Sequence, residues 1–300
     1  MRKKRFIATA GFLMTLVLLF STVGASAAVY VQDGKYKYQL FTDNTVALAG
    51  YISDTVDDVT VPRYYDQSTV VSVTDYGLAD NQSIRSIDFM TAPELSKIGK
   101  YAFYKCTSLE TLLVPNSIQK VEISAFRECT GLEKVEFYGN DNSVPIEAFY
   151  GCSALKDVRL SARIKSIQSC AFAGCTSLEY LELTDSIVYI ASNAFTDDDN
   201  LTLGVWYDSY AYNYVVENQL QYVLLDGVKL GDTDGDGYVN INDVTAIQRH
   251  LAELEHLEGI YLHAADANQD GTVDIADATI IQMYLAEYDM EYPIGEVMTQ

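Results

Sequence analysis

Apolar residues in the middle of the chain recur at a constant step of twenty-three positions. Ala-Phe pairs mark this period, and six residues after each Phe comes a segment of the form L-x-x-L-x-L or a close variant. The pairs begin at Ala102, Ala125, Ala148, Ala171 and Ala194. A degenerate unit, Gly77-Leu78, precedes the first pair at a slightly longer step. One unit cannot bury its own apolar face, so we predict about six stacked coils, each with one short parallel strand.

The segments on either side of the repeats have different patterns. Residues 30–58 alternate apolar and polar positions between Gly and Asp turns, which predicts short strands. Residues 206–226 are typical of a short helix followed by a strand. We interpret both segments as caps, because the end coils of a solenoid need their apolar faces covered.

An acidic pattern of twelve residues occurs twice after the second cap. The first copy is DTDGDGYVNIND, Asp232 to Asp243, and the second is DANQDGTVDIAD, Asp266 to Asp277. Each has a carboxylate or amide at positions 1, 3, 5, 9 and 12, with Gly at position 6. This spacing supplies the six to eight oxygens that Ca²⁺ prefers. Each pattern is followed by apolar residues at helical spacing: Val244, Ile247 and Leu251, then Ala278, Ile281 and Leu285.

The sequence therefore predicts two calcium sites of a structural kind. Crowded carboxylates repel one another without a cation, so we expect metal binding to contribute folding free energy. Tyr238 and Thr272 would contribute main-chain carbonyls, and Asn240 would hold a water. The predicted side-chain ligands are Asp232, Asp234, Asp236, Asp243, Asp266, Asn268, Asp270, Asp274 and Asp277.

The start of the chain predicts export. Four cationic residues precede an apolar run from Phe6 to about Phe20, and Ala25-Ser26-Ala27 is typical of a signal-peptide cleavage site. The predicted organisation is a signal peptide over residues 1–27, a capped solenoid over 28–227 and a small all-α calcium module over 228–300. The formal charge of −22 argues against nucleic acid or anionic membranes as partners. No later segment is apolar enough for membrane insertion.

Cysteine and histidine positions limit the chemistry of the solenoid. Four of the five cysteines share one repeat position, so they form a ladder: Cys106, Cys129, Cys152 and Cys175. Neighbouring rungs would be near enough for a disulfide, but side chains that point the same way into a packed interior favour free thiols. All three histidines lie after residue 249, which excludes histidine-based triads and zinc sites from the repeats.

Carboxylate pairs remain as candidates for glycoside hydrolysis. Glu133 with Glu136, and Glu179 with Glu182, are examples. They alternate with apolar strand positions, which indicates a solvated face of the solenoid.

Both signatures resemble known families. The string A-F-x-x-C-x-x-L over about residues 59–205 is similar to BspA-like leucine-rich repeats, which occur in bacterial surface and secreted proteins. The duplicated loop-helix units over about residues 229–290, with Asp at position 12, resemble a type I dockerin. That resemblance implies calcium-dependent binding to a cohesin domain on a cellulosome scaffold. It places the cohesin contacts at loop positions 10 and 11 and on the following helix: Ile241, Asn242, Gln248, Arg249, Glu253, Ile275, Ala276, Gln282, Met283 and Glu287.

Taken together, the sequence favours a secreted, non-catalytic cellulosome subunit of a polysaccharide-degrading system, held at the cell surface through a scaffold. Its leucine-rich-repeat solenoid would present a protein- or carbohydrate-binding surface to an unknown ligand. Two alternatives remain: a carbohydrate-active enzyme with a carboxylate site in the solenoid, and an adhesin for host or neighbouring-cell proteins. Because the two loop-helix copies differ, we expect one cohesin orientation to dominate. We also expect residues 292–294 to fold back on Val228 or Leu230.

Overall fold

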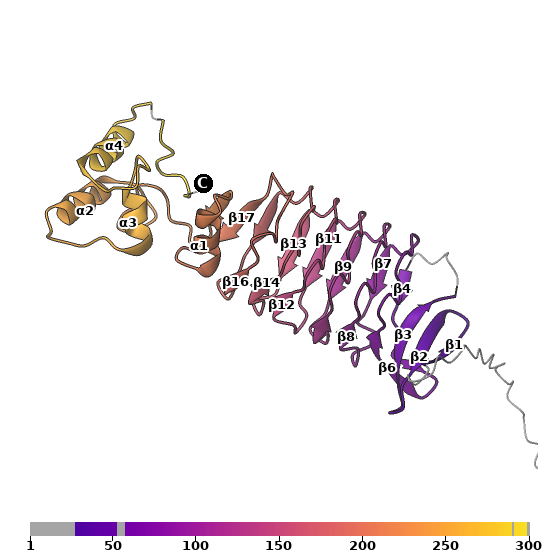
Figure 1. Cartoon of the computed structure of the whole chain (residues 1–300). Helices are drawn as coiled ribbons and strands as arrows, with labels where there is room; N and C mark the ends of the chain where they lie inside the picture. The colour runs from indigo at the N-terminus through magenta and orange to yellow at the C-terminus, as the bar shows by residue number, and fades with distance from the viewer. Residues whose placement is uncertain (1–27, 53–57, 290, 299–300) are drawn as a thin grey trace, which may run out of the picture.

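A solenoid of stacked coils forms most of the molecule, and a small helical module lies at its C-terminal end (Figure 1). The computed structural model describes residues 28–52, 58–289 and 291–298, so the predicted signal peptide lies outside the described residues. One row of parallel strands, here called the strand face, runs along the solenoid. In chain order its strands are β4 (Asp58–Thr60), β7 (Ser86–Asp88), β9 (Thr111–Val114), β11 (Lys134–Phe137), β13 (Asp157–Leu160), β15 (Tyr180–Glu182), β17 (Thr202–Val205) and β18 (Tyr222–Leu224).

Strand pairing confirms the predicted repeat fold. Lys134 is paired with Thr111 on one side and Asp157 on the other, so the register advances by one repeat length at each step. The degenerate first unit is longer than the others, as predicted. Its Ser86 pairs with Thr111, twenty-five positions further along, whereas later coils step by twenty-three. The six predicted coils supply β7 to β17, and the caps add β4 and β18 to the two ends of the row.

The strand face is interrupted once. Hydrogen-bonded pairing runs without a break from β4 to β13 and again from β15 to β18, but β13 and β15 are not paired. A second row of two-residue strands follows another side of each coil, with a break between β10 and β12. These short strands are β8 (Lys97–Ile98), β10 (Lys120–Val121), β12 (Ser143–Val144), β14 (Ser166–Ile167) and β16 (Tyr189–Ile190).

Phenylalanine and cysteine ladders fill the core. Successive Phe rings of the Ala-Phe pairs stack nearly parallel, with centroids 5.3–5.9 Å apart, from Phe103 to Phe195. The four ladder cysteines are buried and free, as predicted. Each Sγ lies 3.1–3.3 Å from a carbonyl oxygen of the preceding coil. The thiols therefore donate to main-chain carbonyls, and those of Phe103, Phe126 and Phe149 each also accept from the amide three residues further along.

Two residues in most coils have a left-handed backbone. In the coil that contains Ala125 and Phe126, they are Ser124 (φ 56°) and Glu128 (φ 58°), which flank the Ala-Phe pair. The equivalent positions Glu147 and Gly151 have φ values of 53° and 71°. This conformation is unfavourable for side chains other than glycine and asparagine, and it persists because the packed coils on both sides fix the turn.

Both caps have the predicted form. At the N-terminal end, β1, β2 and β3 form an antiparallel meander, and β3 pairs in parallel with β6 of the solenoid. At the other end, α1 (Tyr210–Glu217) precedes β18, and Ser209 caps the helix by accepting a hydrogen bond from the Tyr212 amide. The N-terminal strands are β1 (Val29–Gln32), β2 (Tyr36–Leu40), β3 (Thr45–Tyr51), β5 (Tyr64–Tyr65) and β6 (Ser68–Val73).

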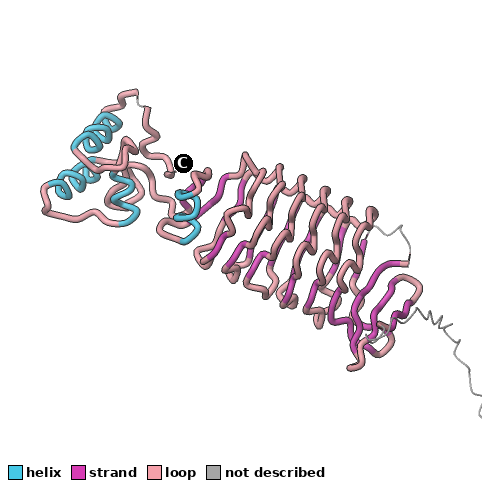
Figure 2. Tube along the Cα trace, in the orientation of Figure 1, coloured by secondary structure: helices cyan, strands magenta, loops and turns pink. Residues whose placement is uncertain are grey.

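The C-terminal module contains three helices, α2 (Ile241–Leu251), α3 (Gly259–Ala265) and α4 (Ile275–Leu285), drawn in cyan together with α1 in Figure 2. Helices α2 and α4 are the predicted pair, and Ile247 and Ile281 are fully buried between the elements. The sequence pattern predicts Leu251 and Leu285 on the same apolar faces, but they are 39% and 37% exposed. Within the described part of the chain, no helix has the length and apolar character needed to cross a membrane.

The end of the described chain joins the module to the solenoid. Met298 donates from its amide to the Val228 carbonyl, and its own carbonyl accepts from the amide of Leu224 in β18. Leu230 exchanges main-chain hydrogen bonds with Gly295 and Glu296, and Ile294 is buried. The tail thus folds back on Val228 and Leu230, but its hydrogen bonds come from Gly295, Glu296 and Met298 rather than from the expected residues 292–294, and it also reaches the cap strand.

Candidate functional site

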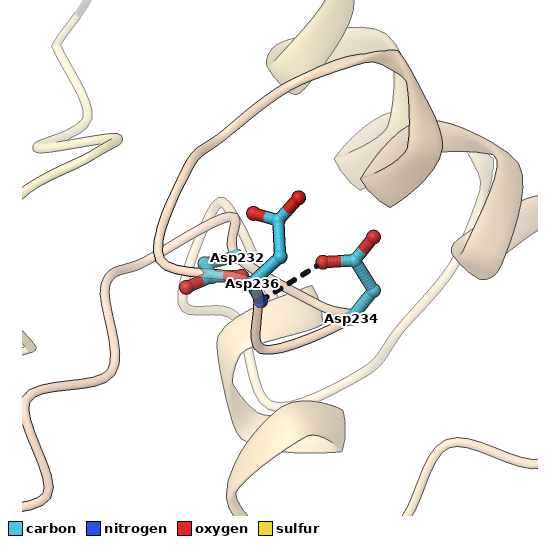
Figure 3. A group of neighbouring side chains, drawn as sticks. All are labelled: Asp232, Asp234 and Asp236. Carbon is cyan, nitrogen blue, oxygen red and sulfur yellow. Dashed lines mark hydrogen bonds between the residues drawn. The ribbon is translucent and has the colours of Figure 1, made fainter.

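Three carboxylates of the first acidic loop lie together. Oxygen atoms of Asp232, Asp234 and Asp236 are all within 4.8 Å of one another, and Figure 3 shows the three side chains on one turn of the loop. Asp232 is 2% exposed, whereas the other two are exposed. Clustered carboxylate oxygens are the ligands that a hard cation such as Ca²⁺ prefers, so the residues present fit this ion.

Main-chain amides hold the Asp232 carboxylate in place. Its Oδ1 accepts from the amide of Gly235 and its Oδ2 from the amide of Gly237, each at 3.0 Å. Gly237 has a φ of 86°, so the loop reverses at position 6 as predicted. Figure 3 also shows the 3.1 Å bond from the Asp236 amide to Asp234.

The second loop repeats this arrangement. Asp266 accepts from the amides of Asp270 and Gly271 at 3.0 and 2.8 Å. Gly271 has a φ of 91°. Asn268 takes the place of Asp234, and its amide group donates to Asp270 at 2.9 Å. The second loop therefore has one carboxylate fewer at positions 1, 3 and 5.

The aspartates at position 12 close the loops. Asp243 is fully buried, with Oδ1 accepting from Thr233 and Oδ2 from Asn240, both at 2.7 Å. Asp277 is also fully buried and accepts from Asn268 and Asp274. Each position-12 residue also forms a capping box with position 9, which starts the helix inside the loop at position 10. A loop and its helix are therefore built as one unit.

Without a bound cation, the negative charges of these loops destabilise the folded protein. Burial and the nearby carboxylates of Asp243 and Asp236 raise the pKa of Asp232 above its usual value. Burial likewise raises the pKa of Asp277. A bound divalent cation would offset this repulsion between like charges.

All ten residues expected to contact a cohesin are exposed. Ile241 and Ile275, both at loop position 10, are 60% and 61% exposed. These apolar side chains begin helices α2 and α4, and Leu251 and Leu285 end the same helices with more than a third of their surface exposed. Sequence reasoning missed these two leucines as surface residues, because their helical spacing matches that of the buried positions.

The carboxylate pairs considered for catalysis lie on the solvated strand face. Glu133 is exposed and pairs with Lys156 at 3.8 Å. Glu136 pairs with Lys134 at 2.8 Å, and this bond lowers the pKa of Glu136. A general acid needs a raised pKa at neutral pH, so the environment of Glu136 does not favour that role.

Comparisons with known proteins match the two parts of the chain separately. The BspA type leucine rich repeat region matches residues 67–202 in six copies. The dockerin type I domain matches residues 230–286. No curated protein matches the chain.

Solved structures of leucine-rich-repeat proteins are similar to part of the chain at low identity. A leucine rich cell surface protein from Faecalibacterium prausnitzii is 22% identical over 59% of this chain and 55% of its own, with a TM-score of 0.46. A leucine-rich repeat protein from Eubacterium ventriosum is 22% identical over 57% of this chain and 50% of its own, with a TM-score of 0.47. This chain thus spans about half the length of these two proteins. It carries a BspA-type leucine-rich-repeat region followed by a C-terminal type I dockerin domain.

Proposed function

We propose that the protein is an exported, non-catalytic adaptor that docks onto a scaffold and presents its solenoid to a ligand. The dockerin binds a cohesin domain of a scaffold protein, as in a cellulosome, and the solenoid contributes the second binding surface. Neither domain type is a catalytic module, which supports a binding role.

The observation that carries this proposal is the duplicated loop-helix unit. Each loop is fused to its helix by a buried aspartate, Asp243 or Asp277. A cation that orders the loop therefore also fixes the first turn of the helix, where the exposed isoleucines lie. Two bound Ca²⁺ ions would thus act structurally, by holding the partner-binding helices in position.

Calorimetric titration of the mature chain against a panel of cohesins tests the proposal. We expect tight binding by at least one cohesin in Ca²⁺ and none in EDTA. Asp236→Asn removes one predicted ligand charge and should weaken calcium and cohesin binding together. Asp185→Asn neutralises an exposed aspartate of the solenoid and serves as the matched control. Binding that is unchanged in EDTA, or absent with every cohesin, would contradict the docking role.

A further inference from the structure

A groove opens on the strand face where the row of strands is interrupted. It lies at the unpaired step between β13 and β15 and has a volume of about 460 Å³. This size is within the range of clefts that bind small ligands. Its lining combines aromatic and charged groups: Tyr138, Lys156, Asp157, Arg159, Tyr180 and Glu182.

Tyr180 forms a platform at one side of this groove. Its ring extends over Gly204 of the next strand, where an added Cβ would lie 2.3 Å from the tyrosine Oη and 3.0 Å from Cζ. Gly204 has no positive φ, so its backbone does not require glycine. Glycine is unfavourable within a strand and often marks a close approach. Here it lets the tyrosine ring pass over β17, while 44% of Tyr180 stays exposed.

The charges around the groove are balanced. The lining contains two cations, Lys156 and Arg159, and two carboxylates, Asp157 and Glu182. Arg159 pairs with Asp157 at 3.7 Å, whereas Glu182 has no ion pair within the described residues. Such a site has no excess of positive charge to attract an anionic ligand, but it offers a neutral ligand both hydrogen-bond donors and acceptors. Tyr138, 37% exposed, adds a second aromatic group at the end of β11.

We propose that this groove binds a neutral oligosaccharide, with one sugar ring stacked on Tyr180 and its hydroxyl groups bonded to Arg159 and Glu182. Sugars present apolar C–H faces together with closely spaced hydroxyls, which suits an aromatic ring flanked by charged donors and acceptors. This inference rests on the proposed function, because it names the ligand class of the surface that the dockerin would carry to a scaffold.

A protein partner fits the groove less well. The core of a protein interface is depleted in charge and rich in apolar contact. The outward positions of β11 and β13 are instead occupied by an ion-paired network of Lys134, Glu136, Asp157 and Arg159. Burying such a charged surface under a large protein partner would carry a high desolvation penalty. A bound sugar would leave much of the water on these charged groups in place.

The test uses the calcium-loaded mature chain and calorimetric titration with neutral hexasaccharides of glucose, xylose and mannose. An oligogalacturonide serves as the anionic comparison. We expect at least one neutral hexasaccharide to bind and the anionic one to bind more weakly. Cohesin binding, measured on the same samples, separates a failure of this inference from a failure of the docking role.

Variants of Tyr180 identify the site. Tyr180→Ala should weaken binding about tenfold, as expected for the loss of one stacked ring, whereas Tyr180→Phe should retain most of the affinity. Gly204→Ala should also weaken binding, because its Cβ displaces the ring. Tyr189→Ala, at a tyrosine of matched exposure on β16 (46%), is the control. No binding by any neutral hexasaccharide, or equal binding by Tyr180→Ala and wild type, would overturn the inference and leave the groove to a protein partner.

Discussion

Asp198 should make the solenoid less stable as the pH rises toward neutrality. It stands in the last coil at the position of the ladder cysteines, is 8% exposed, and neither of its carboxylate oxygens has a hydrogen-bond partner. The four thiols before it each donate to a carbonyl of the preceding coil. A carboxylate can do so only when it is protonated. Asp198 can therefore continue the ladder only as the neutral acid.

The size of the effect follows from the pKa. Burial raises the pKa of Asp198 from 3.8 to about 7, although the nearby amides of Cys175 and Gly174 partly offset the shift without bonding to the carboxylate oxygens. At about 1.36 kcal/mol per pH unit, the full shift would be worth roughly 4 kcal/mol. Local relaxation around the charged carboxylate would reduce this penalty, so we expect about half of it. Because the folded pKa is the higher one, stability is complete below about pH 4 and is lost as the pH rises to about 7.

Replacing the residue tests this reasoning. Asp198→Cys restores the thiol and cannot ionise in this range, so its unfolding free energy should match wild type near pH 4 and exceed it by about 2 kcal/mol at pH 7.5. Urea titrations followed by the fluorescence of Trp206, the single tryptophan, would measure both. Asp185→Asn, at an exposed aspartate that is not among the groups shifting the pKa of Asp198, is the control. A difference between Asp198→Cys and wild type that stays constant from pH 4 to 7.5 would refute the argument.

Four further outcomes are expected. Chelation of calcium should lower the melting temperature of the dockerin, since each site at a hundredfold excess over Kd contributes about 2.7 kcal/mol; an unchanged melting curve in EDTA would contradict a structural role. Alanine substitutions at Arg249 and at Met283 should reduce cohesin affinity unequally, whereas equal losses measured by calorimetry would indicate two binding orientations. Ile294→Asp should destabilise the calcium-loaded dockerin by about 2–4 kcal/mol by placing a charge in a buried site, and a melting temperature equal to wild type would rule out the tail contact. Phe149→Ala should cost about 3–5 kcal/mol by interrupting the stacked rings, with Tyr189→Ala as the control in the same denaturation assay.

The repeat fold could be predicted because each coil buries the same residue types at the same step. A constant repeat length specifies strand register directly, as the pairing of Lys134 with Thr111 and Asp157 illustrates. The calcium loops were visible for a similar reason. Their oxygens and glycines are required at fixed positions, so the spacing is retained in both copies.

Other features leave weaker signals. Helix α3 has only seven residues, begins at a glycine, and its N-cap residue Glu258 makes no side-chain capping bond, so its formation depends on tertiary packing. The left-handed residues Ser124 and Glu147 are not residue types that favour that conformation. The break beside β13 and the position of the Tyr180 ring involve contacts between consecutive coils, about one repeat apart in the sequence, and no local pattern encodes them. Gly204 is the one residue in the sequence that reflects the position of the Tyr180 ring. Its role can be recognised only when the packing of strands β15 and β17 is known.

Met298 links strand β18 to the segment that enters the dockerin, with hydrogen bonds to both Leu224 and Val228. The connection therefore has little slack, unlike a flexible tether between two freely tumbling modules. Eight strands at about 4.8 Å spacing make the solenoid a spacer roughly 35 Å long. A ligand held on its strand face would therefore be carried at a fixed distance and in a fixed direction from the helices that would dock on a scaffold.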